Sequence, residues 1–65
     1  MTGIVKRLMQ EKGYFFVRDE NGREYFGHRS EVLRDGFKEL REGDRVSFDE
    51  SSSAKGPRAT NIVRM

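Results

Sequence analysis

The sequence predicts an all-β protein that folds as one small five-stranded antiparallel barrel. Short apolar segments of strand length recur along the 65 residues, and turn sequences rich in glycine, aspartate and asparagine separate them. No segment repeats apolar residues at helical spacing over its full length. A barrel is the expected arrangement because closing a sheet of short strands removes its exposed edges. Residues 1–65 show no internal repeat and are expected to form a single domain.

The first three predicted strands cover residues 3–9, 14–17 and 24–28. Val5 is expected to point inward from the first of them. The polar segment between the second and third strands contains Asn21-Gly22, and this pair readily adopts the positive φ angles of a tight hairpin turn. These two strands should therefore pair directly.

The fourth and fifth predicted strands cover residues 45–49 and 59–63. Alternation places Val46 and Phe48 in the interior, and Ile62 is expected to point inward from the last strand. The serine-rich residues 50–56 between these strands are interpreted as a mobile polar loop.

The segment between the third and fourth strands contains few apolar residues. Ser30 is predicted to cap a brief helical turn over residues 31–33. Gly36 and Gly43 mark further turns on either side of Leu40.

Aromatic residues occupy alternate positions of the two strands that flank the hairpin. Tyr14 and Phe16 share one face because residues two apart on a strand point the same way, and Phe26 and His28 share the matching face of the next strand. Rings left on a polar surface favour a ligand that stacks on them, and nucleic-acid bases have that property. The alternative interpretation is a second core or a dimer face.

Charge and composition limit the function classes. The chain has 13 Lys and Arg residues, 11 Asp and Glu residues and a calculated pI near 9.3, so any affinity for a polyanion must come from clustering of the cations. There is no cysteine and no apolar run of membrane-spanning length, so we expect a soluble cytoplasmic protein without a membrane partner. His28 has no second His or Cys to join it in a metal site, and no set of catalytic side chains is apparent. We therefore expect no metal, cofactor, small-molecule substrate or enzymatic activity.

Several separate motifs, in order along the whole chain, resemble the bacterial cold-shock proteins. They are Thr2-Gly3-Ile4-Val5-Lys6, Lys12-Gly13-Tyr14, Phe26-Gly27-His28, Gly36-Phe37-Lys38, Leu40-Arg41-Glu42-Gly43 and Ala54-Lys55-Gly56-Pro57. The resemblance runs from Met1 to Met65, with one residue fewer in the hairpin turn. It implies a single cold-shock domain of the OB-fold type that binds single-stranded RNA and DNA and acts as an RNA chaperone or transcription antiterminator.

Four positions depart from the usual pattern of that family. Arg7 stands where the family has Trp, and Arg29 where it has Phe, and both positions belong to the base-stacking surface. An arginine can stack its guanidinium on a base and also contact a phosphate, so we expect partial compensation with a stronger salt dependence. Phe15 and Gly27 stand where the family has Gly and Val. If the hairpin pairs Phe15 with Gly27 in the interior, the two changes conserve volume.

The predicted nucleic-acid contacts combine aromatic rings with cations near them. Phe37 is expected to stack on a base, although a role in the core is the alternative. Any one of the cations could equally be an ordinary solvated charge. The predicted site comprises Lys6, Arg7, Lys12, Tyr14, Phe16, Phe26, His28, Arg29, Phe37, Lys55 and Arg58.

Three functions remain open from the sequence. The leading hypothesis is a monomeric, non-catalytic binder of single-stranded RNA and DNA. The alternative, suggested by Arg7 and Arg29, is a protein–protein interaction module with weakened nucleic-acid binding. A third is a domain similar to those of translation factors, bound to folded ribosomal RNA.

Overall fold

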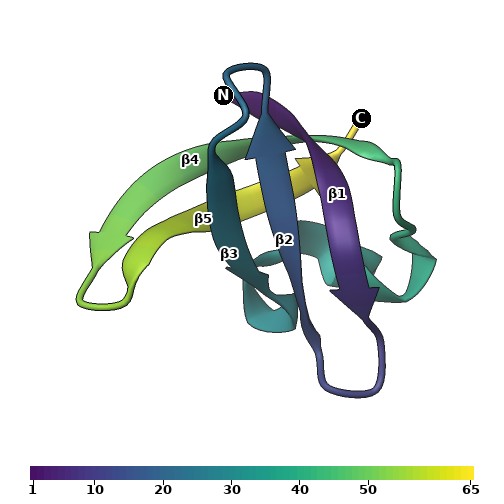
Figure 1. Ribbon diagram of the computed structural model, residues 1–65. Coiled ribbons are helices and arrows are strands. Elements are labelled where there is room, and N and C mark those ends of the chain that lie inside the picture. The colour runs from purple at the N-terminus through teal and green to yellow at the C-terminus, as the bar shows by residue number, and fades with distance from the viewer.

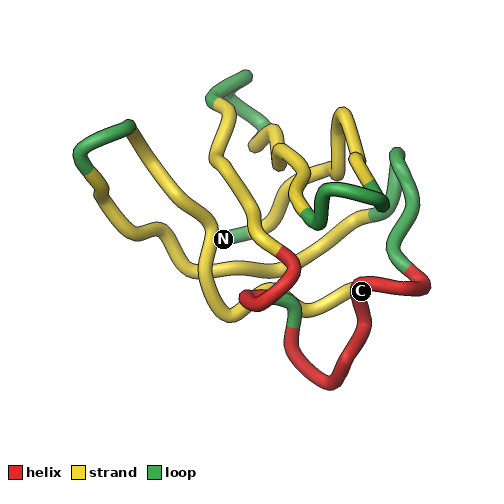
Figure 2. Tube along the Cα trace, turned by 90° about the horizontal axis from the view of Figure 1, so that it is seen from below, coloured by secondary structure: helices red, strands yellow, loops and turns green.

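The computed structural model describes residues 1–65, apart from the side chain of Asp35, and confirms the predicted all-β barrel. The strands are β1 (Thr2–Met9), β2 (Tyr14–Asp19), β3 (Glu24–His28), β4 (Arg45–Ser53) and β5 (Gly56–Arg64). They close in the order β1-β2-β3-β5-β4 (Figure 1). Two 3₁₀ helices, η1 (Arg29–Glu31) and η2 (Leu33–Glu39), connect β3 to β4 and lie on the same side of the barrel (Figure 2).

The hairpin between β2 and β3 forms at the predicted Asn-Gly turn. The Gly22 N–H donates to the Asp19 carbonyl at 3.0 Å, and Gly22 has a φ of +84°. The Asp19 carboxylate accepts from the backbone N–H groups of Asn21 and Arg23 and from the Tyr25 hydroxyl. Burial raises the pKa of Asp19, but these hydrogen bonds lower it to a net value below the usual range. Burial raises the pKa of Tyr25, and its hydrogen bond to Asp19 raises it further.

Strands β4 and β5 are longer than predicted. The interpretation of residues 50–56 as a loop is wrong, because Glu50–Ser53 continue β4 and pair with Gly56–Ala59 of β5. Only a two-residue turn, Ala54-Lys55, separates the strands. Backbone pairing and a few side-chain contacts, such as the hydrogen bond from the Ser53 hydroxyl to the Gly56 carbonyl, hold this hairpin arm, which projects from the barrel in Figure 1. Alternation could not reveal it, since side chains 50–55 are all exposed.

The two junctions that close the barrel differ in strand direction and in the number of paired residues. Strand β1 pairs with β4 in antiparallel fashion at Thr2, Gly3 and Ile4. Strands β3 and β5 instead run parallel and pair at one position, Phe26 with Arg58. The barrel is therefore antiparallel at every junction except this one.

Apolar side chains fill the barrel interior. Val5, Val46, Phe48 and Ile62 are at most 2% exposed, which confirms their predicted inward orientation. The complete core comprises Val5, Phe15, Val17, Tyr25, Val32, Phe37, Leu40, Val46, Phe48, Ala59 and Ile62.

Phe15 and Gly27 pair directly across β2 and β3, as predicted. Phe15 is fully buried, and a Cβ atom added to Gly27 would lie 2.7 Å from Phe15 Cε2. The ring therefore covers the glycine and occupies the space that a side chain at position 27 would need.

The connection between β3 and β4 differs from the prediction. Ser30 does not cap the short helix: the His28 side chain caps η1, and its Nδ1 accepts from the Ser30 N–H. The region around Gly36 belongs to η2 and is not a simple turn. In the described part of the chain, no helix is long and apolar enough to cross a membrane.

Candidate nucleic-acid interface

Tyr14, Phe16, Phe26 and His28 lie on one face of the β2–β3 hairpin, as predicted. We call these four residues the ring cluster. All four are half-buried, so they are neither core residues nor fully solvated. The register pairs Tyr14 with His28 and Phe16 with Phe26.

The benzene rings of the cluster support one another. Tyr14 and Phe26 stack with centroids 5.8 Å apart and an interplanar angle of 26°. Phe16 meets Phe26 edge-on at 5.8 Å and Tyr14 edge-on at 6.2 Å. Such contacts fix the ring orientations before any ligand arrives.

Cations flank the ring cluster on both sides. Lys6 of β1 pairs with Phe16, and Arg58 of β5 pairs with Phe26. Cross-strand partners share a face, so the four side chains form one row across the sheet. The Arg58 Cζ atom lies 5.6 Å from the centroid of the Phe26 ring, within the range of a cation–π contact.

A pocket of about 420 Å³ opens beside Phe16 and Phe26. The end of the β4–β5 arm forms its other wall. Sequence reasoning proposed Lys55 and Arg58 here but missed Ser53, Gly56 and Pro57, which also line the pocket. The long pairing of β4 with β5, which the sequence did not reveal, carries these residues to the rings.

Hydrogen bonding fixes the orientation of His28. Its Nδ1 lies 2.8 Å from the Ser30 Oγ and accepts from the Ser30 N–H at 3.1 Å. The neutral ring therefore carries its proton on Nε2, which remains available as a donor to a ligand.

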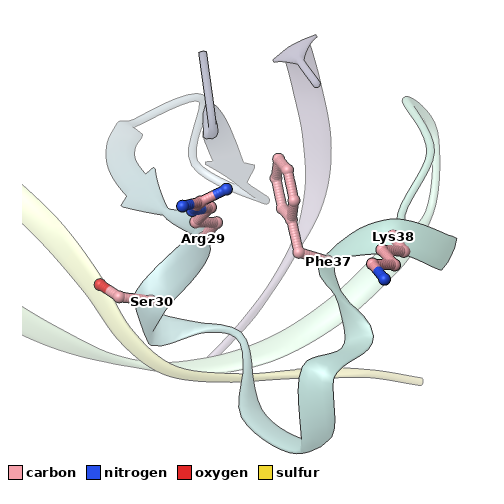
Figure 3. A pocket seen from close by; sticks show the side chains of 4 residues that line it. All are labelled: Arg29, Ser30, Phe37 and Lys38. Atoms are coloured by element: carbon pink, nitrogen blue, oxygen red, sulfur yellow. The ribbon is translucent and has the colours of Figure 1, made fainter. Parts of the chain in front are cut away.

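Arg29 lies beside a second pocket, of about 400 Å³, together with Ser30, Phe37 and Lys38 (Figure 3). Its backbone N–H donates to the Gly13 carbonyl at 2.8 Å. A Cβ atom at Gly13 would lie 2.9 Å from Arg29 Cδ, so the arginine stem packs where only glycine leaves room. Lys38, which the sequence analysis did not include, also contributes a positive charge.

The ring of Phe37 is too buried to be fully free for stacking on a base. It is 9% exposed, and its ring stacks on Phe15 at 6.0 Å with an interplanar angle of 27°. Most of the ring therefore belongs to the core, which was the alternative interpretation of Phe37. Its remaining surface lines the pocket with Arg29, and Figure 3 shows both side chains directed toward the same opening.

Arg7 lies at an irregularity in β1, where the register shifts between Lys6 and Met9. Neighbouring residues of a regular strand point to opposite faces, but the φ of +49° at Arg7 rotates the backbone. Arg7 is therefore exposed even though the preceding residue, Lys6, also faces outward. The hydrogen bond from Arg18 lowers the pKa of Glu24. Burial raises that pKa, and the charges of Arg18, Arg7 and Lys6 lower it further. The positive charge of Arg7 is thus among those that lower the pKa of Glu24 on β3.

Lys12 is exposed in the turn before β2 and lines neither pocket. The structure places six of the eleven predicted residues at two pockets. Phe16, Phe26, Lys55 and Arg58 line one, and Arg29 and Phe37 line the other. The remaining predicted residues line neither pocket; they are Lys6, Arg7, Lys12, Tyr14 and His28. His28 and Arg29 are adjacent in sequence and link the two groups.

Comparison with known proteins agrees with this architecture. The profile of the "Cold-shock" DNA-binding domain family matches residues 1–65. Cold shock protein 1 of Lactiplantibacillus plantarum is 49% identical over 62 residues, which cover 95% of this chain and 94% of that protein. Cold shock-like protein CspC of Bacillus cereus is 43% identical over 65 residues, covering 100% of both chains. The major cold shock protein of Streptococcus pyogenes is 43% identical over 63 residues, covering 97% of this chain and 94% of that protein. The chain therefore belongs to the cold-shock domain family.

Proposed function

We propose that this protein is a monomeric, non-catalytic binder of single-stranded RNA and DNA. The observation that carries the proposal is the row of Lys6, Phe16, Phe26 and Arg58 across four strands. Rings in the middle of this row offer flat apolar surfaces, and cations at its ends offer charge to phosphates. The family's description as a DNA-binding domain supports the same class of ligand.

In the proposed complex a single strand crosses β2 and β3. Its bases stack on Tyr14, Phe16, Phe26 and His28, with a further contact at the exposed edge of Phe37. Lys6, Arg7, Lys12, Arg29, Lys55 and Arg58 steer the phosphates. A duplex hides the faces of its bases, so stacking of this kind selects unpaired strands.

Binding of this kind supports the role of an RNA chaperone or transcription antiterminator. Trapping the unpaired strand shifts marginal RNA hairpins toward their open form by mass action, without ATP. The same shift prevents formation of hairpins that would end transcription.

The test is a titration of the full chain against a fluorescently labelled dT₇ oligonucleotide and a labelled duplex, at low and moderate salt. A label is required because the chain contains no Trp. Phe16→Ala and Phe26→Ala should each weaken dT₇ binding by about 5- to 150-fold, which corresponds to the loss of one stacked base. Leu33→Ala is the matched control, since Leu33 is 44% exposed and lies outside both pockets.

Circular dichroism of each variant checks that the fold is retained, and sedimentation checks the monomeric state. The proposal is wrong if dT₇ fails to bind at tens of micromolar protein and low salt, or if duplex binds equally well. A folded Phe16→Ala variant with unchanged affinity would also contradict it and would favour a protein–protein role for this face.

A further inference from the structure

In the part of the chain that the structure describes, Arg58 lacks the carboxylate partner that several other arginines have. Arg18 pairs with Glu24, Arg23 with Glu50, and Arg64 with Asp44 and Glu39. Among the described residues, no carboxylate lies within ion-pair distance of the Arg58 guanidinium. Its Nε is buried and has no hydrogen-bond partner in the described structure. This N–H is closed to a ligand, so any base contact must use the two terminal Nη groups, for which the described residues provide no hydrogen-bond or ion-pair partner.

The surroundings of Arg58 restrict the ligand that can use this capacity. The guanidinium lies over the Phe26 ring, and the adjoining pocket is lined by Phe16, Pro57 and the exposed end of the β4–β5 arm. None of the described side chains that line this pocket is acidic. A flat ligand with hydrogen-bond acceptors on its edge fits such a site better than a cation or a purely apolar group.

The bases differ in how well they match a guanidinium fork. Guanine presents two adjacent acceptors, O6 and N7, which accept both parallel N–H groups of an arginine. On this same edge adenine places a donor beside N7, cytosine presents a donor, and thymine presents the single acceptor O4 beside a methyl group. In an unpaired strand the Watson–Crick edges are free as well, and there cytosine has the adjacent acceptors N3 and O2. A fork on guanine is distinguished from one on cytosine by its use of N7.

We propose that Arg58 makes the pocket beside Phe26 selective for guanine in a bound single strand. The inference rests on the proposed function and adds a base preference to it. The competing outcome is that Arg58 contacts phosphate alone, as in the proposed function, which would raise the affinity for all sequences alike.

The test compares the full chain and its variants on labelled dT₇ and on the same oligonucleotide with dG at the central position. We expect the wild type to bind the dG probe about 5- to 150-fold more tightly. Replacing dG with 7-deaza-dG, which lacks the N7 acceptor, should remove most of that preference. Arg58→Lys keeps the charge and removes the fork, so its ratio of affinities for the dG probe and dT₇ should fall to about one.

Arg23→Gln is the matched control for Arg58→Gln. Arg23 also lies over a ring, that of Tyr25, but Glu50 pairs with it and it lines neither pocket of the interface. Both changes remove one positive charge, and only Arg58→Gln should abolish the preference for dG. Equal wild-type affinity for dG and dT₇ probes, or a preference that persists in Arg58→Lys, overturns the inference while leaving the proposed function intact. Failure of both probes to bind overturns the proposed function itself.

Discussion

Replacing Gly27 with valine tests whether Phe15 occupies the space above position 27. A Cβ atom there would lie 2.7 Å from Phe15 Cε2 and 2.8 Å from Cζ. Carbon atoms in contact normally lie about 3.5–4.0 Å apart, so the ring must move by about 1 Å. Phe15 is fully buried and stacks on Phe37, which leaves it no free direction. The two additional methyl groups of valine increase the conflict.

Overpacking of this kind destabilises a core by about 1–3 kcal/mol. In a domain of this size each kcal/mol lowers the melting temperature by about 4–8 °C. We therefore expect Gly27→Val to melt about 4–24 °C below the wild type, as measured by far-UV circular dichroism. A melting temperature within about 2 °C of the wild type would refute the reasoning.

The compensating change provides a sharper check. Phe15→Gly together with Gly27→Val restores a small residue opposite a large one and roughly conserves the buried volume. The double variant should therefore be more stable than the sum of the two single changes predicts, by at least about 1 kcal/mol. If the Phe15→Gly single variant does not fold, a folded double variant gives the same answer. Additivity within about 0.5 kcal/mol would show that the two side chains do not share space.

Three further predictions concern other parts of the chain. Arg29→Ala should reduce the slope of log affinity against log salt for dT₇ by about 0.7, as expected for one lost phosphate contact; an unchanged slope would exclude that contact. Asp19 has a lowered pKa in the folded state, so it stabilises the fold above its ordinary pKa of 3.8 and loses this effect as the pH falls through the lower folded value. The difference in melting temperature between wild type and Asp19→Asn should thus shrink between pH 6 and pH 2.5, and a constant difference would contradict the assignment. Gly13→Ala should lower the melting temperature, since Gly13 has a φ of +76° and its Cβ would contact Arg29; an unchanged value would show that the backbone relaxes without strain.

Local sequence patterns predicted the β1–β3 half of the barrel well. The Asn21-Gly22 pair determines the position of the hairpin turn. The position of the turn determines the register, which pairs Phe16 with Phe26 and Phe15 with Gly27. The same register placed the ring cluster on one face. These features depend on residues close in sequence, which is why alternation and turn chemistry were sufficient.

The parts that the sequence left undetermined depend on contacts between distant segments. Gln10 donates to the carbonyls of Phe37 and Leu40, and such long-range support brings η2 over the barrel and buries Phe37. Arg58 reaches Phe26 only through the parallel closure of β5 on β3. The prediction of Ser30 as a helix cap was wrong because a histidine ring nitrogen performs that role, and histidine is not among the common capping residues.

The projecting β4–β5 arm has a consequence for how the barrel opens. Its strands are paired through Ser51–Ser53 and Gly56–Arg58, yet it contributes no side chain to the core before Ala59. Amide protons there are therefore protected by strand pairing without apolar burial, and they should exchange with solvent sooner than those around Val46 or Ile62. Lys55 lies at the tip of this arm, whereas Arg58 also pairs with Phe26 of β3, so exchange should begin at the Lys55 side of the pocket wall and reach Arg58 later.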